Sequence, residues 1–283
     1  MKNKHLPVAL ALLTLTYALF YPTVSKLYRT RQHFSLSNIS SSLTYEPQDC
    51  FTLQSPLQLE HTLDQAYRYA EQSSDSFNFV SKDGNYVLKL IKRPRKTPLI
   101  FFLPPPTSFK KKEHIWESYL ITGSTLKEET GLLFLHLQRT NQLHKKLTVS
   151  DKYGKIYTID LDDYAFLIQK NTHQIYPTII RWMQEGKSDK AKALINNMLQ
   201  VVRSTEEKSI SYKKATMNKT FGCIDEQCLL IDVGQLQNHL PTKPYSEDID
   251  DVTKRFNKWL QKHYPELSTH LENQLRERKN NTG

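Results

Sequence analysis

The segment that most constrains the fold of this chain lies between Asn218 and Gln235. Apolar runs over 221–223 and 228–231 have four residues between them, a pattern typical of two short strands joined by a tight turn. Asn218 precedes this predicted hairpin, and Asp232 follows it at the start of an Asp-Val-Gly step. The simplest interpretation is a buried strand that ends in a turn, because Asp and Gly terminate many strands. Whether the segment does more depends on the rest of the chain.

The composition is that of a folded chain with a basic surface. Its 283 residues are enough for one large two-lobed domain or two small ones. Fifteen Tyr, twelve Phe and only eight Gly exclude a disordered or low-complexity chain. The net charge of +10 favours anionic partners such as nucleotide phosphates, nucleic acid or acidic lipid headgroups. The basic residues are scattered and no nucleic-acid-binding motif accompanies them, so no nucleic-acid partner is expected.

The three cysteines are Cys50, Cys223 and Cys228. An odd number without histidines at metal-ligand spacing indicates neither a disulfide framework nor a zinc site. Cys223 and Cys228 flank the turn of the predicted hairpin and could face each other across it. Only an oxidising compartment would make that pair a disulfide.

An uncharged stretch over residues 6–24 has basic residues on both sides. Its nineteen residues are long enough to cross a bilayer. No small-x-small cleavage site follows, which favours an uncleaved anchor over a signal peptide. We expect a single-pass membrane anchor within 1–34 and a Ser-rich linker over 35–56. The flanking charges are balanced, so the side of the membrane that the domain faces is left open.

Residues 57–170 are predicted to be mainly β-structure with embedded helices. Apolar residues at helical spacing indicate a first helix near 57–72. The Asp83-Gly84 step is a strong signal for a β-hairpin. The predicted strands lie near 77–81, 85–92, 132–137, 146–150, 156–159 and 164–169, and a second helix lies near 110–129 with its stop at Gly131.

Residues 171–283 change to a mainly helical pattern. A short helix is predicted near 175–184, and a longer one with a broad buried face begins at Ser188. After the hairpin, two amphipathic helices are predicted on either side of Pro265.

A lysine-bearing strand, a helix, and an Asn-hairpin-Asp segment embedded in a helical second half occur here in the order seen in protein kinases. The chain therefore resembles the protein-kinase-like fold, an α+β fold of two lobes with a β-rich N-lobe and a helical C-lobe. Here the predicted transmembrane helix would precede it. The segments Tyr86–Lys89, Lys127–Leu137 and Asn218–Gly234 also look like an uncharacterised group of kinase-like proteins from chlamydia-type bacteria, which brings no known substrate.

The resemblance implies roles for four residues. Lys89 would be the strand lysine at the nucleotide site, and Glu117 on the following helix its ion-pair partner. Asn218 and Asp232 would be metal ligands beneath the phosphates, with ATP and Mg²⁺ as cofactors. Without the resemblance, a lysine on such a strand is more often an edge or outward-facing residue.

Two departures from the kinase pattern bear on activity. No glycine occurs from Ala70 to Asn78, so the flexible Gly-rich loop over the phosphates is missing. The catalytic-loop Asp should lie five residues before Asn218, but Lys213 stands there, and no Asp or Glu occurs over 208–224. A charged lysine cannot accept the proton of an acceptor hydroxyl.

The sequence therefore predicts a membrane-anchored pseudokinase that binds a nucleotide, a protein partner or both. One alternative is an active atypical kinase that uses ATP and a divalent metal, with a carboxylate from elsewhere in the fold. Another is a non-enzymatic interaction domain in which Lys89 and Asp232 are incidental. Convergence of Lys89, Asn218 and Asp232 on one cleft would favour a kinase-derived site.

Overall fold

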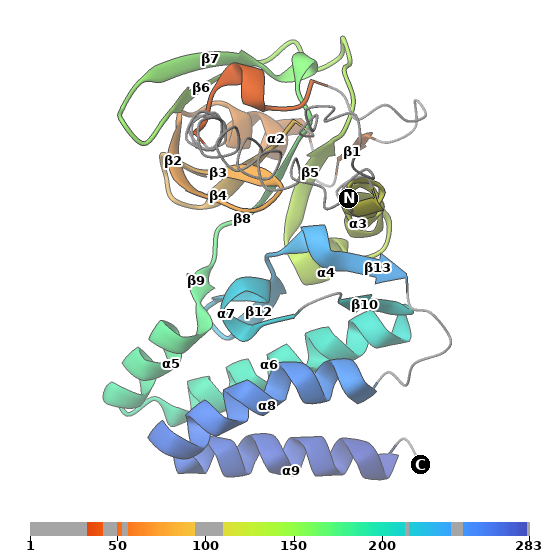
Figure 1. Cartoon of the computed structure of the whole chain (residues 1–283). Helices are drawn as coiled ribbons and strands as arrows, with labels where there is room; N and C mark the ends of the chain where they lie inside the picture. Colours follow the sequence, from red (N-terminus) through yellow and green to blue (C-terminus); the bar gives the residue numbers. More distant parts are fainter. Residues whose placement is uncertain are drawn as a thin grey trace, which may run out of the picture.

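The computed structural model describes residues 33–41, 50–52, 56–93, 110–212, 215–238 and 246–281. The predicted anchor over 6–24 and Lys213 both lie outside these ranges. Within them, no helix is both long and apolar enough to span a bilayer. A β-rich lobe sits above a helical lobe, and the chain passes from one to the other after strand β8 (Figure 1).

The N-lobe is built on one curled sheet in the order β1-β5-β8-β4-β3-β2-β6-β7. Neighbouring strands are antiparallel except for β2 and β6, which run parallel. The strands are β1 (Cys50–Thr52), β2 (Tyr67–Gln72), β3 (Ser76–Ser81), β4 (Tyr86–Ile91), β5 (Leu132–His136), β6 (Lys146–Ser150), β7 (Ile156–Asp160) and β8 (Phe166–Lys170). The strands predicted from alternation and from the Asp-Gly step are therefore confirmed.

The N-lobe core forms where alternate side chains of β3 and β4 meet on one face of the sheet. Phe77 and Phe79 are fully buried there. Phe34 packs edge-on against both rings, with centroid distances of 5.5 and 4.9 Å. Ile39, just after the 3-10 helix η1 (Leu36–Asn38), is also buried in this core. Residues assigned from the sequence to the flank and linker thus belong to the packed lobe.

The helix predicted near 57–72 is only half right. Helix α2 spans Pro56–Leu63, and the rest of the segment forms β2. Tyr67 is buried and Tyr69 partly buried in the N-lobe core, while Ala66 and Ala70 are exposed. This alternation of period two fits a strand paired with β3, and the same residues also fit a helical period, which caused the error.

The helix predicted near 110–129 is divided into α3 (Lys110–Ser124) and α4 (Lys127–Thr130). Gly131 ends it as predicted, with a left-handed φ of 59° that favours glycine. Helix α3 packs against the 3-10 helix η3 (Val233–Gln235) and strand β13 (Leu236–Asn238). It therefore bridges the sheet and the segment that follows Asp232.

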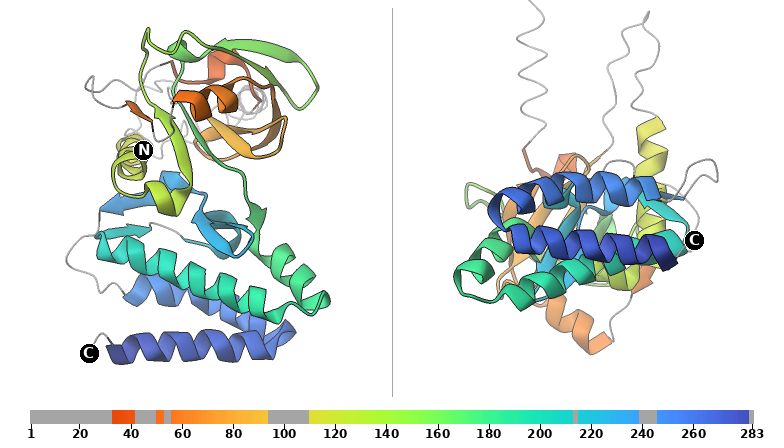
Figure 2. Two further views of the ribbon diagram at one scale, coloured as in Figure 1. Left: turned by 180° about the vertical axis from the view of Figure 1, so that it is seen from behind. Right: turned by 90° about the horizontal axis from the view of Figure 1, so that it is seen from below.

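The C-lobe stacks helices beneath two small sheets, β10-β13 and β12-β11-β9. Figure 2, seen from below, shows α8 and α9 side by side. The further elements are β9 (His173–Gln174), α5 (Ile175–Gln184), α6 (Ser188–Glu207), β10 (Ile210–Tyr212), α7 (Met217–Thr220), β11 (Phe221–Ile224), β12 (Gln227–Leu230), α8 (Ser246–His263) and α9 (Pro265–Asn281). The predicted hairpin and the predicted helices of this half are confirmed.

The two lobes share one apolar core. Leu135 and Leu167 of the sheet belong to the same buried cluster as Ile195 of α6 and Leu230 of β12. Cys223 and Cys228 lie opposite each other in the hairpin as free, buried thiols. This mixed α/β architecture, with a curled β-sheet lobe and a helical part, is compatible with a kinase-like fold.

Candidate functional site

Strand β4 directs Lys89 toward the junction of the lobes. Its neighbours Leu88 and Leu90 are fully buried in the N-lobe core, so Lys89 points to the opposite face of the sheet. The Lys89 Nζ donates a hydrogen bond to the carbonyl oxygen of Ile231 at 2.5 Å. The strand lysine is thus joined to the residue that immediately precedes Asp232.

Asp232 lies where the chain leaves β12. The Ile231 amide donates to the Thr220 carbonyl at 2.8 Å, which holds this exit against α7. Burial raises the pKa of Asp232, Asp75 raises it further, and Lys89 acts against both. Lys89 therefore lies near Asp232, and each acts on the pKa of the other.

The acid that the sequence did not single out is Asp75, in the turn between β2 and β3. Its side chain is buried, with 8% of the residue surface exposed. Its Oδ2 accepts a hydrogen bond from the Tyr119 hydroxyl of α3 at 2.5 Å, and its Oδ1 accepts one from Ser73 at 2.5 Å. A Cβ built on Gly234 would lie 2.4 Å from Oδ2. The Asp75 carboxylate therefore lies directly against the Asp-Val-Gly backbone.

The turn that carries Asp75 is short and tightly bonded. The Ser73 hydroxyl accepts from the Asp75 and Ser76 amides at 3.3 and 3.0 Å. The Lys92 amide donates to the Asp75 carbonyl at 2.7 Å, and the Lys92 ammonium donates to the Ser73 carbonyl at 2.5 Å. In a kinase, the Gly-rich loop joins the first two strands of the lysine-bearing meander. Here a pinned turn with a buried acid takes that place.

The charges around Lys89 are mainly negative. Burial lowers the pKa of Lys89, while Asp75, Asp232 and Glu71 act to raise it. Burial likewise raises the pKa of Tyr119 well above its ordinary value, and Asp75 adds to the effect. The Tyr119 hydroxyl therefore stays protonated as a donor to Asp75. Three carboxylates of the same chain thus offset the charge of one ammonium, which disfavours further negative charge nearby.

Glu117 is placed away from this cluster. Its carboxylate accepts a hydrogen bond from the Asn238 side chain at 3.0 Å. The acids that act on Lys89 are Asp75, Asp232 and Glu71. The expected ion pair between Lys89 and Glu117 is therefore not formed. The reason lies in helix geometry: residues two apart on a helix point about 200° apart, and α3 turns Tyr119 to the site.

Asn218 is exposed on α7. Within the residues that the structure describes, no group of three or more His, Cys, Asp or Glu side chains could hold a metal. The metal-binding roles of Asn218 and Asp232 stay predictions. Magnesium nucleotide does not fit the site as it stands, because the Asp75 carboxylate lies against Gly234, where the phosphates would need room and positive charge.

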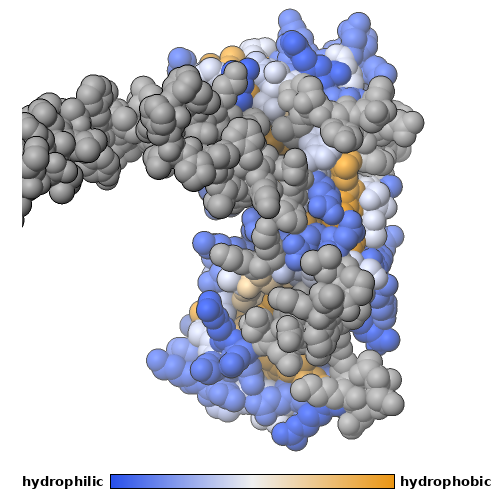
Figure 3. Space-filling model, turned by 45° about the vertical axis from the view of Figure 1, so that its right-hand side comes forward, coloured by the Kyte–Doolittle hydropathy of each residue, from blue (hydrophilic) through white to orange (hydrophobic). Residues whose placement is uncertain are grey.

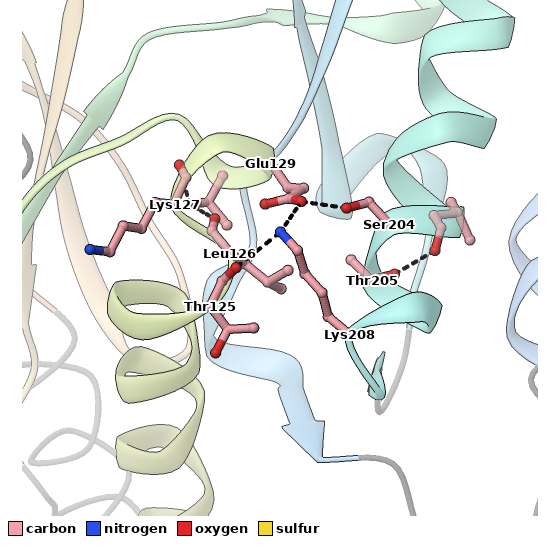
Figure 4. A network of polar contacts seen from close by, with 9 residues as sticks. Thr125, Leu126, Lys127, Glu129, Ser204, Thr205 and Lys208 are labelled. Atoms are coloured by element: carbon pink, nitrogen blue, oxygen red, sulfur yellow. Dashed lines mark hydrogen bonds and ion pairs between the residues drawn. The ribbon is translucent and has the colours of Figure 1, made fainter.

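A polar network anchors the N-lobe to helix α6 (Figure 4). The buried Glu129 carboxylate accepts hydrogen bonds from the Ser204 hydroxyl at 2.5 Å and from the Lys208 ammonium. Lys208 also donates to the Thr125 carbonyl at 3.1 Å. Burial acts to raise the pKa of Glu129, but the hydrogen bonds from Lys208 and Ser204 outweigh it and lower that pKa.

Figure 3 shows a mainly hydrophilic face with small apolar areas between polar side chains. A shallow recess on the N-lobe shares no residue with the cluster around Lys89 and is lined by His33, Phe34, Tyr69, Gln72, Asp151, Lys152 and Tyr153. The site between the lobes is therefore the candidate that chemistry favours.

Comparisons with known proteins give a limited likeness. No protein-family model matches the sequence, and no curated protein matches it. Among solved structures, the kinase domain of a Toxoplasma gondii specific rhoptry antigen matches with a TM-score of 0.31 and 14% sequence identity. The match covers 59% of this chain and 48% of that one, so it spans about half of the relative. A TM-score at this level carries no argument about activity. None of these comparisons supports the resemblance to proteins of chlamydia-type bacteria.

Proposed function

We propose that this chain is a kinase-like protein that does not transfer phosphate and acts by binding a protein partner. The observation that carries the proposal is the state of Lys89. Its ammonium donates to the Ile231 carbonyl, and the charges of Asp75 and Asp232 act on it, so groups of its own chain already stabilise it. The carboxylates nearby offset the charge of this ammonium, so a phosphate would gain less from it than from the strand lysine of an active kinase.

The sequence supports the same proposal independently. Lys213 stands where the acceptor-orienting carboxylate of a kinase belongs, and no acid occurs over 208–224. Without that carboxylate, the segment 208–224 has no acid to take up the proton of the acceptor hydroxyl. A membrane anchor over residues 6–24 is part of the proposal and would hold the domain close to a membrane-associated partner.

The test is a direct assay of phosphate transfer and hydrolysis. The full chain, purified in mild detergent, is incubated with radiolabelled ATP and Mg²⁺ or Mn²⁺, beside Asp232→Asn. We expect the wild type to release and transfer no more phosphate than the variant. Transfer that is present in the wild type and lost in Asp232→Asn would establish an active atypical kinase and overturn the proposal.

A further inference from the structure

We propose that the Asp75 carboxylate is a built-in substitute for a nucleotide's phosphate, which fills the place between Tyr119 and Gly234 at the junction of the lobes and excludes phosphate ligands. This inference rests on the proposed function in taking the junction of the lobes as the kinase-derived site. It adds the residue that decides which ligands can enter. The class excluded is that of nucleoside di- and triphosphates and pyrophosphate.

The first argument is position. Asp75 comes from the N-lobe turn, Tyr119 from α3, and Gly234 from the segment after the hairpin, so three distant parts of the chain meet at one carboxylate. The approach to Gly234 is so close that any side chain there would collide with Oδ2. The glycine of the Asp-Val-Gly step thus makes room for an acid of the same chain.

The second argument is rigidity. A glycine-rich loop can move to admit phosphates, whereas this turn has hydrogen bonds to its backbone on both sides. The Lys92 amide donates to the Asp75 carbonyl, and the Lys92 ammonium donates to the Ser73 carbonyl. The Ser73 hydroxyl accepts from the Asp75 amide and donates to the Asp75 carboxylate. Asp75 is therefore fixed in place and cannot swing aside without breaking several bonds.

The third argument is charge. Lys89 already has Asp75, Asp232 and Glu71 as counter-charges. A di- or triphosphate would have to enter beside two carboxylates that are largely buried, where like charges repel strongly. Removing the Asp75 side chain would leave Lys89 and exposed backbone beside an empty space of carboxylate size. That space would be an anion site.

The experiment compares the full-length wild type with Asp75→Gly and Asp75→Asn. Asp75→Gly removes volume and charge, whereas Asp75→Asn removes charge and keeps the volume. Binding of ATP and of pyrophosphate, each with and without Mg²⁺, is measured by calorimetry and by thermal shift. We expect no binding to the wild type at 5 mM ligand (about 100 times a weak Kd of roughly 50 μM), clear binding of both ligands to Asp75→Gly, and at least tenfold weaker binding to Asp75→Asn.

Controls separate occlusion from general effects. Asp163→Gly removes an acid whose side chain is 47% exposed on the N-lobe surface and should not create binding. If Asp75→Gly does not fold by circular dichroism, Asp75→Ala is assessed by the same criteria. A folded glycine or alanine variant that binds neither ligand overturns the inference, and so does a wild type that binds as tightly as the variant.

The outcomes also separate this inference from the proposed function. A wild type that binds ATP without transferring phosphate overturns the inference alone. An Asp75→Gly variant that both binds ATP and transfers phosphate supports the inference but contradicts the proposal that the chain lacks the means of transfer. A variant that binds without transfer supports both.

Discussion

The Tyr119 hydroxyl donates a 2.5 Å hydrogen bond to the Asp75 carboxylate and thereby joins helix α3 to the β2–β3 turn. Both side chains are buried, Tyr119 almost completely. In kinases, the helix at this place pairs a glutamate with the strand lysine. Here a tyrosine on that helix donates to an acid of the β2–β3 turn, and the charge of that acid acts on Lys89. The neutral Tyr119 hydroxyl and the charged Asp75 carboxylate thus close the N-lobe over the site.

Tyr119→Phe tests this contact. The phenylalanine keeps the ring but leaves a buried carboxylate oxygen without its donor, which costs about 1–3 kcal/mol of unfolding free energy. Urea unfolding at pH 7 measures the loss. In an Asp75→Asn background the same change should cost less, because no buried charge is left unpaired. Equal costs in both backgrounds would show that the loss comes from elsewhere.

Gly234→Ala tests the close approach of Asp75. The added Cβ would lie 2.4 Å from Oδ2, so the carboxylate or the backbone has to move. Crowding of this kind costs about 1–3 kcal/mol. Denaturant unfolding should show this destabilisation in the wild type.

The matched control for this prediction is Gly234→Ala in Asp75→Gly protein. With the carboxylate absent, the added methyl has room, and most of the destabilisation should disappear. Residues in contact show non-additive effects of this size, whereas independent sites add. Additive losses would contradict direct contact between Asp75 and Gly234.

Asp232→Asn should stabilise the fold at neutral pH relative to the wild type. Burial and Asp75 raise the pKa of Asp232, so its ionised form opposes folding. A raised carboxyl pKa means that the folded state binds more protons, and stability falls as pH rises from about 4 through the folded pKa. The gain in stability from Asn should therefore vanish near pH 4 and grow as pH rises above it. A gain in stability that does not depend on pH would show that ionised Asp232 does not oppose folding.

The sequence was sufficient for elements whose pattern is local. Alternating apolar residues on both sides of the Asp83-Gly84 turn predict the strands around Lys89 correctly. The Asn218 to Asp232 hairpin is equally local, because its two apolar runs and its turn define it. Such patterns need no knowledge of distant contacts. The segment 64–72 failed because two periods fit the same residues.

The charges around Lys89 could not be predicted in the same way. Asp75 reaches the site because the β2–β3 turn folds over Gly234, and this is a tertiary relationship with no local pattern. The available signal was that a serine-rich turn with an acid replaces the glycines of a kinase loop. Glu117 fitted the kinase order but lies on the wrong side of α3, where it contacts Asn238.

Lys208→Ala tests the polar network that joins α4 to α6. It removes the cation that donates to Glu129, whose side chain is only 9% exposed. The buried carboxylate keeps Ser204 as a donor, so we expect a loss of about 1–3 kcal/mol at pH 7. A Glu129→Gln/Lys208→Met double variant should lose less, because no buried charge is left without its partner.

The pH dependence makes this last prediction specific. In the wild type the pKa of Glu129 is lowered, so its contribution is present above the unfolded value of about 4.3 and is lost as pH falls through the folded pKa. In Lys208→Ala the hydrogen bond from Lys208 no longer offsets burial, so the pKa of Glu129 should rise. Protonation then relieves the buried charge, so the cost of the substitution should shrink between pH 7 and pH 4. A cost that stays constant over this range would show that Lys208 acts through packing of its alkyl chain and not through Glu129.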